Sequence, residues 1–170
     1  IGTWMSRLAQ SAYGAVAASG ADYRRIVSND QNVIELDTAF EDNAAYDTGS
    51  DVADDMWAIT NDSGLTIPFD FCFQDIGYWL HMALGGYSVS GPDGSGRYSH
   101  IFTPQNMNTS RQLPVRTFGK KYGGLKIVIM RDGVCTQLSL SGQKTGRLKC
   151  SANVKGSGHY AEDPASYAQP

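Results

Sequence analysis

LTIPFDFCF occupies residues 65–73, and the chain continues as QDIGYWLHMAL to residue 84. In residues 65–73, five apolar side chains stand at every second position, which predicts a strand with one apolar face. Pro68 has no N–H to donate, so we expect the strand to lack a neighbour on one side at that point. After Asp75 the apolar residues recur at i, i+3 and i+4. This spacing predicts a short α-helix, at about residues 75–84, that ends at a pair of glycines.

The strand and the helix carry the two largest apolar faces in the chain, and they are adjacent in sequence. We therefore expect the helix to dock on the strand, with Trp79 as the largest side chain in the contact. The residues expected in this helix–sheet packing are Phe69, Phe71, Phe73, Ile76, Trp79, Leu80 and Leu84.

The remainder of the chain predicts short strands joined by turns. Two strands are expected near residues 23–27 and 32–36, and others near residues 98–103 and 115–118. The C-terminal part predicts a meander, in which Asp132 and Gly133 are typical of a hairpin turn. The predicted fold class is mainly β, a sandwich or barrel with one short helix packed against it.

Length and composition favour one globular domain. The chain has 170 residues, of which 41% are apolar and 18% charged. No apolar run reaches the roughly 20 residues of a membrane helix, and no signal-peptide pattern is visible, so no membrane insertion is expected. Residues 1–22 are expected to form an N-terminal arm and residues 23–156 the barrel-like domain. Between residues 39 and 60 lies an acidic stretch without periodicity, expected to be a long loop.

The charges are distributed unevenly along the chain. Residues 1–75 contain 13 acidic and 3 basic side chains, a net charge of −10, whereas residues 76–170 contain 4 acidic and 11 basic ones, a net charge of +7. Opposite poles on identical subunits favour head-to-tail association. The alternative interpretation is that both sets are scattered, solvated surface charges.

No pattern of catalytic or metal-binding residues is visible. His81, His100 and His159 do not stand at ligand spacing, and no nucleophile or phosphate-binding motif occurs. The three cysteines form no CxxC pair and are expected to be buried, reduced thiols. The basic pairs are too sparse for a nucleic-acid interface in an acidic protein. We therefore expect no enzyme activity, no cofactor and no metal.

Several segments resemble, in the same order, the tail tube proteins (major tail proteins) of long-tailed bacteriophages. These segments are SAYGAV, the acidic stretch, LTIPFDFCF, DIGYWLHMALGG, YSHIFTP and DGVCTQLSLSGQKTGRLKCSANVKG. The resemblance covers nearly the whole chain, and the order of the segments carries it.

The resemblance implies a subunit that forms hexameric rings, which stack into a hollow tube. DNA passes through the lumen without specific binding. Other partners would be further tail proteins, and the location would be the virion tail after assembly in the host cytoplasm. Many family members continue with a second, similar half. Residues 157–170 are thus either a C-terminal arm or the start of such a half, and the ring is either a hexamer or a trimer of longer chains.

The charge split and the resemblance together suggest which residues meet between stacked rings. The candidate bases for this contact are some of Arg111, Arg116, Lys120, Lys121 and Lys144. The expected inter-ring contacts are Glu41, Asp42, Asp47, Asp51, Asp54 and Asp55 on one pole, and Lys120 and Lys121 on the other.

Other functions remain open at this point. Terminator, distal-tail and baseplate hub proteins share the tube fold and are the nearest alternatives. A carbohydrate- or ligand-binding β-module is a further alternative, for which Trp4, Trp57 and the nine tyrosines would be the evidence.

Overall fold

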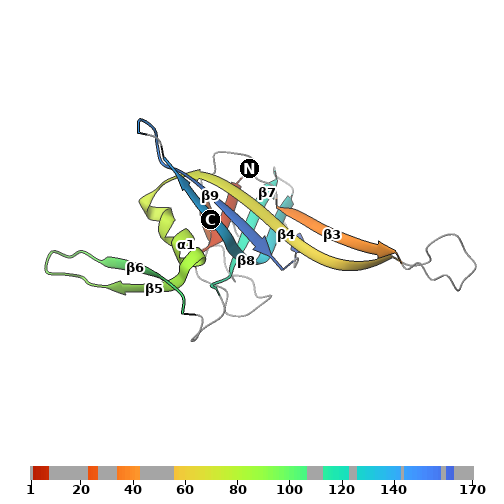
Figure 1. The fold of residues 1–170 in the computed structure, drawn as a ribbon, viewed down its shortest axis with the longest axis horizontal. Coiled ribbons are helices and arrows are strands. Elements are labelled where there is room, and N and C mark those ends of the chain that lie inside the picture. Colours follow the sequence, from red (N-terminus) through yellow and green to blue (C-terminus); the bar gives the residue numbers. More distant parts are fainter. Residues whose placement is uncertain are drawn as a thin grey trace, which may run out of the picture.

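The computed structural model describes residues 2–7, 23–26, 34–42, 56–106, 113–122, 126–142, 144–157 and 160–162. Strands predominate among them, and one helix is present (Figure 1), which confirms the mainly β class with one short helix. In chain order the elements are β1 (Gly2–Ser6), β2 (Tyr23–Ile26), β3 (Glu35–Asp42), β4 (Met56–Asp70), α1 (Phe73–Leu84), β5 (Gly85–Ser90), β6 (Ser99–Pro104), β7 (Arg116–Tyr122), β8 (Lys126–Ser141), β9 (Lys149–Gly156) and β10 (Tyr160–Glu162).

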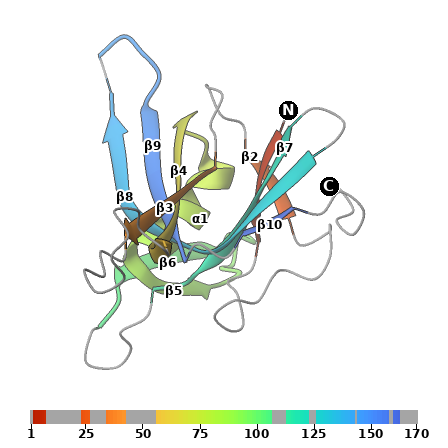
Figure 2. The same cartoon turned by 90° about the vertical axis from the view of Figure 1, so that its right-hand side faces the viewer.

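All strand pairs are antiparallel, and the main sheet has the order β2-β1-β7-β8-β9-β4-β3, with β10 also on β8. The first half of β8 pairs with β7 and β10, and the second half pairs with β9. The sheet therefore folds into two layers that share β8 (Figure 2). Its end strands β2 and β3 do not meet, so the described strands form an open sandwich and not a closed barrel.

The bend of β8 lies at Asp132 and Gly133, and the hairpin turn predicted there is wrong. Asp132 has a φ of 55°, a left-handed conformation that Asp tolerates better than most residues. A Cβ on Gly133 would lie 2.6 Å from the ring of Phe118 and 2.9 Å from the carbonyl oxygen of Arg116. At the Asp-Gly pair β8 therefore passes from the first layer into the second. Glycine is required at residue 133 because the Phe118 ring occupies the space that a side chain there would need.

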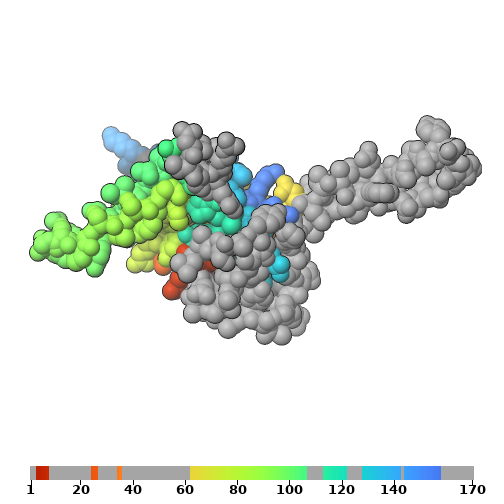
Figure 3. All heavy atoms as spheres, turned by 90° about the horizontal axis from the view of Figure 1, so that it is seen from below, coloured from red at the N-terminus to blue at the C-terminus, as the bar shows by residue number. Residues whose placement is uncertain are grey.

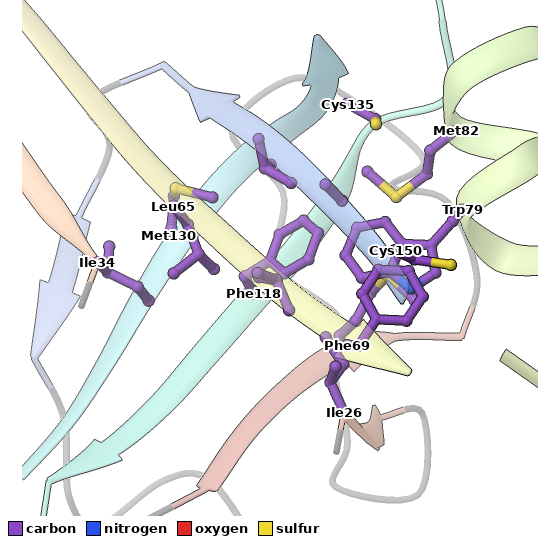
Figure 4. Close-up of a cluster of buried hydrophobic side chains, with 14 of the residues drawn as sticks. Ile26, Ile34, Leu65, Phe69, Trp79, Met82, Phe118, Met130, Cys135 and Cys150 are labelled. Atoms are coloured by element: carbon purple, nitrogen blue, oxygen red, sulfur yellow. The ribbon is translucent and has the colours of Figure 1, made fainter. Parts of the chain in front are cut away.

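The core lies between the two layers and is closed at one end by α1. Trp79 is fully buried and stacks on Phe69 of β4 at 5.3 Å between ring centroids and on Phe118 of β7 at 6.1 Å (Figure 4). The other core residues are Met5, Ile26, Ile34, Leu65, Ile67, Ile76, Met82, Val128, Met130, Cys135, Cys150, Ala152 and Val154.

The observed contact between α1 and the sheet differs from the expected one at several residues. Phe71 and Leu80 pack only partly against the core, Leu84 is half-buried, and Met82 is buried although it was not expected. The placement of Phe73 in the core is wrong, since its side chain is 88% exposed. The strand stops at Asp70 and the helix begins at Phe73, so the two-residue alternation no longer applies there.

Pro68 lies where β4 has one neighbour, as its missing N–H predicts. β4 pairs with β3 only between Met56 and Gly64, whereas Pro68 faces Ser151 of β9. Proline is tolerated because no described strand requires a hydrogen bond from it on the other side.

Parts of the two expected arms form strands of the sheet. Residues 2–6 of the supposed N-terminal arm form β1, which lies between β2 and β7 inside the sheet. The two strands expected to flank Ser28 are separated, because β2 and β3 lie at opposite ends of the sheet. Within residues 157–170, β10 pairs with β8.

The acidic stretch 39–60 is more regular than expected. β3 extends to Asp42 and β4 begins at Met56, and these two residues are paired across the ladder. Strand pairing therefore includes residues 39–42 and 56–60, with a register shift between Ala39 and Phe40. Residues 43–55 lie outside the described part of the chain.

Trp79→Ala should lower the free energy of unfolding by roughly 3–5 kcal/mol, because it removes the ring between Phe69 and Phe118. Chemical denaturation measures the loss. Tyr98→Ala removes an aromatic ring that is 60% exposed and serves as the control with little expected effect. Equal stabilities of the two variants would contradict this view of the core.

Gly133→Ala should destabilise the fold by about 1–3 kcal/mol, because the new methyl group overlaps the Phe118 ring. Gly94→Ala is the matched control, since a Cβ there meets nothing within 4 Å. Thermal unfolding of both variants checks the prediction, which fails if Gly133→Ala melts at the wild-type temperature.

Candidate assembly surface

The β5–β6 hairpin projects from the body of the molecule as a two-stranded sheet of its own (Figures 1 and 3). Its ladder extends from Gly85 opposite Pro104 to Ser90 opposite Ser99. At the tip, the Asp93 carboxylate accepts hydrogen bonds from the backbone N–H of Ser95 at 2.8 Å and of Arg97 at 2.9 Å. The Arg97 guanidinium also donates to it at 2.9 Å. Hydrogen bonds from the Arg97 and Ser95 backbone lower the pKa of Asp93, so its charged form stabilises this turn.

Large apolar side chains on this hairpin are exposed. They are Tyr87, Val89, Tyr98 and Ile101. Tyr87 and Val89 share one face of β5 with their cross-strand partners Phe102 and His100. An apolar surface on a projecting arm is typical of a protein–protein contact.

Two glycines fix the hairpin against the helix. Gly85 caps α1 with a φ of 87°, and the carbonyl of Leu84 accepts a hydrogen bond from the N–H of Gln105 at 2.7 Å. Gly77 lies within the helix, where a Cβ would come 3.3 Å from the Phe102 ring. Glycine at this helical position lets the hairpin lie close to α1.

A cleft of about 530 Å³ lies between α1 and the hairpin. Its wall on the hairpin side is aromatic: the Tyr87 hydroxyl and His100 Nδ1 are hydrogen-bonded at 2.9 Å, and the Tyr87 ring lies 5.5 Å from that of His81. The lining residues that matter below are Tyr78, His81, Tyr87, His100, Phe102 and Arg116.

Arg116 lines this cleft although only 3% of its surface is exposed. One guanidinium nitrogen donates to the carbonyl oxygens of Ser6, at 2.7 Å, and of Arg7. The other terminal nitrogen lies 3.4 Å from Nδ1 of His81, and the group lies 5.4 Å from the centroid of the Tyr78 ring. Its Nε–H is buried, and no described residue accepts a hydrogen bond from it. Burial lowers the pKa of this guanidinium from its ordinary value.

His81 is half-buried beside this cation. Burial, and secondarily the charge of Arg116, lower the pKa of its imidazole. The neutral ring can accept a hydrogen bond from Arg116, which a protonated ring could not do.

The residues expected to form contacts between stacked rings differ in their exposure, and several lie outside the described residues. Lys120 is buried and Lys121 is half-buried, so the lysine pair does not form an exposed basic pole. Lys144 is exposed, and Arg116 is a basic residue that lines the cleft. Glu41 and Asp42 end β3, with side chains outside the described set. Outside the described residues lie Asp47, Asp51, Asp54, Asp55 and Arg111.

Sequence reasoning missed the aromatic wall of the cleft. The signal was present in GGYSVS and SHIFTP, where Tyr87, His100 and Phe102 fall on one face once the two segments pair. Only the register makes this face visible, because the segments are separated by a turn of eight residues, 91–98.

The cysteines are free thiols. Cys135 and Cys150 are buried, and burial raises the pKa of both, whereas Cys72 is exposed against expectation. The described residues contain no cluster of three or more potential metal ligands. They also contain no helix long and apolar enough to cross a membrane.

No protein-family model and no curated protein matches this sequence. The fold is similar to that of a chain in the virion of a native gene transfer agent (GTA) particle, with a TM-score of 0.52 and 10% sequence identity. The similarity covers 84% of this chain and 90% of that chain. At this identity the likeness establishes a shared fold.

Acidification should destabilise the protein through His81. Between the ordinary pKa of about 6.5 and the lower folded value, the unfolded chain binds a proton that the folded chain does not. Stability attributable to this group is therefore complete above about pH 6.5 and falls as the pH drops toward the folded pKa. Urea unfolding of wild type and His81→Gln across this range should give a flatter profile for the variant. Parallel profiles would contradict the prediction.

Proposed function

We propose that this chain is a structural virion protein, without enzyme activity, that forms rings which stack into a phage tail tube. The observation that carries the proposal is the fold shared with a gene transfer agent virion chain over 84% of this chain and 90% of that one. The order of the sequence segments, which resembles that of tail tube proteins, supports the same assignment independently of the fold comparison.

The shape of the subunit suits assembly. The paired ends of β3 and β4 extend from one end of the molecule, and the β5–β6 hairpin extends from the opposite end (Figure 1). Two different projecting surfaces favour a heterologous contact, in which one subunit offers one end to the other end of the next. Such contacts produce rings or tubes, depending on whether the rotation closes.

The partners would be further copies of this chain and other tail proteins in the virion. DNA would pass through the lumen of the tube. The net charge of −3 suits a conduit that does not retain phosphates.

Two alternatives have a different outcome in solution. A terminator, distal-tail or baseplate hub protein would form a ring that does not extend into a tube. A ligand-binding β-module is favoured by one observation, the aromatic-lined cleft between α1 and the hairpin.

Negative-stain microscopy and sedimentation velocity of the purified chain test the proposal. Stacked rings or tubes are expected. Single rings under all protein concentrations would favour the terminator class. A monomer that binds glycans would support the ligand-binding alternative and contradict the virion proposal.

Val89→Lys should reduce assembly without unfolding the subunit. Val89 is 53% exposed on the hairpin, so the lysine is tolerated by a single subunit, but an apolar contact between subunits would have to bury its charge. Val89→Thr keeps the shape and the strand propensity and should assemble nearly as wild type. Sedimentation velocity measures assembly, and circular dichroism measures folding. Normal assembly of Val89→Lys would exclude this face of the hairpin from the contact.

A further inference from the structure

Positive charge and aromatic rings line the cleft between α1 and the β5–β6 hairpin. Its described lining residues include two arginines, Arg7 and Arg116, and no Asp or Glu. The one carboxylate of α1, Asp75, pairs with Arg24 and lines a different cavity. Because two like charges meet here without a carboxylate among the described lining residues, this part of the cleft has a positive potential.

The two arginines act on the cleft in different ways. The side chain of Arg7 is exposed, so its guanidinium is the cation that a bound molecule can contact. Arg116 is buried, and the backbone carbonyls of Ser6 and Arg7 accept hydrogen bonds from it. It therefore influences a bound molecule through its charge and not through direct contact. A fixed charge of this kind favours an anion without having to move.

His81 offers the same cleft a hydrogen-bond donor. Arginine has only N–H donors, so the contact of Arg116 with Nδ1 of His81 at 3.4 Å requires that this nitrogen carries no proton. The proton of the neutral ring is then on Nε2. Because Nδ1 is occupied by Arg116, the polar group that His81 can offer to a ligand in the cleft is a donor. Anions accept hydrogen bonds from such donors.

The hairpin side of the cleft is a wall of aromatic rings. Tyr87 stacks on His100 at 6.0 Å between ring centroids and lies 5.3 Å from Phe102. The ring of Tyr87 is nevertheless accessible, since 46% of the residue is exposed. The cleft volume of about 530 Å³ lies within the roughly 300–1,000 Å³ of small-molecule sites. An accessible ring beside donors suits a ligand that has a flat ring of its own.

We propose that the cleft between α1 and the β5–β6 hairpin binds a small planar aromatic anion, such as an aromatic carboxylate. Its ring packs on Tyr87, and its negative group is held by Arg7 and by the donor of His81. A cation would be repelled by the two arginines, and a neutral ring would leave their charge without a counter-charge. The inference goes beyond the proposed function, because it concerns a site within one subunit and needs no contact between copies.

Three small molecules test the ligand class on the wild-type chain by isothermal titration calorimetry. The probe is 2-naphthoate, which has a planar ring and one carboxylate, and saturable binding that weakens as salt rises is expected. The neutral 2-naphthamide should bind at least about tenfold more weakly, as expected for loss of a charge-assisted hydrogen bond. Decalin-2-carboxylate keeps the charge and lacks the flat ring, and it should bind at least about threefold more weakly.

Two pairs of variants test the location of the site. Arg7→Gln should weaken naphthoate binding about tenfold, whereas Lys144→Gln, which removes a positive charge from an exposed side chain outside the cleft, should not. Tyr87→Leu should weaken binding about threefold or more, whereas Tyr98→Leu, also exposed on the hairpin segment but not in the cleft lining, should not. Circular dichroism checks folding. If Tyr87→Leu does not fold, the decalin acid still decides the role of the ring.

NMR of the His81 imidazole nitrogens tests the donor directly. At neutral pH the ring should be the Nε2–H tautomer, and 2-naphthoate should shift its Nε2 resonance. In Arg7→Gln the shift at the same naphthoate concentration should be smaller. A Nδ1–H tautomer, or a resonance that naphthoate leaves unchanged, would contradict the role given to His81.

The outcomes separate this inference from the proposed function. Tubes that form normally while naphthoate does not bind, or binds no better than naphthamide, overturn the ligand site and leave the tail tube proposal intact. Naphthoate binding by a chain that stays monomeric supports the ligand site and counts against the tube. Equal losses in Arg7→Gln and Lys144→Gln would also overturn the site, because binding would then follow overall charge.

Discussion

The stack of Phe69, Trp79 and Phe118 holds the two layers and the helix in one arrangement. Phe69 comes from β4, Phe118 from β7 in the other layer, and Trp79 from α1 lies in contact with both at ring distances of 5.3 and 6.1 Å. Because the helix is fixed by this stack, its C-terminal glycine fixes the direction in which the hairpin leaves the body. The position of the candidate assembly surface therefore depends on a buried aromatic contact.

A second constraint comes from β8, which belongs to both layers. Its bend at Asp132 and Gly133 makes room for the Phe118 ring, so the corner of the sheet and the aromatic stack depend on one another. A residue with a side chain at Gly133 would displace the ring that holds Trp79. The backbone conformation at Gly133, the arrangement of the two layers and the position of α1 therefore all depend on the packing of the Phe118 ring.

Arg116 is a buried charge that links β7 to the end of β1, through hydrogen bonds to the carbonyl oxygens of Ser6 and Arg7. The group is buried, its pKa is lowered by burial, and one of its donors has no acceptor among the described residues. Most buried polar atoms in proteins have a hydrogen-bond partner, so each exception needs an explanation. This cation lies beside the aromatic cleft between α1 and the β5–β6 hairpin.

The sequence by itself determined the elements with strong periodicity: the strand that includes Leu65, Ile67 and Phe69, the helix around Trp79, and the edge at Pro68. Periodicity reports which face of an element is apolar, so these elements could be predicted without knowledge of their neighbours. The register, the long-range pairing and the role of Asp132-Gly133 were decided only by the tertiary structure. The same dipeptide suits a hairpin turn or a strand corner, and the Phe118 ring, 14 residues earlier in the chain, selects the corner. The cleft likewise exists only after β5 pairs with β6 beside α1, because its lining comes from segments that no local pattern connects.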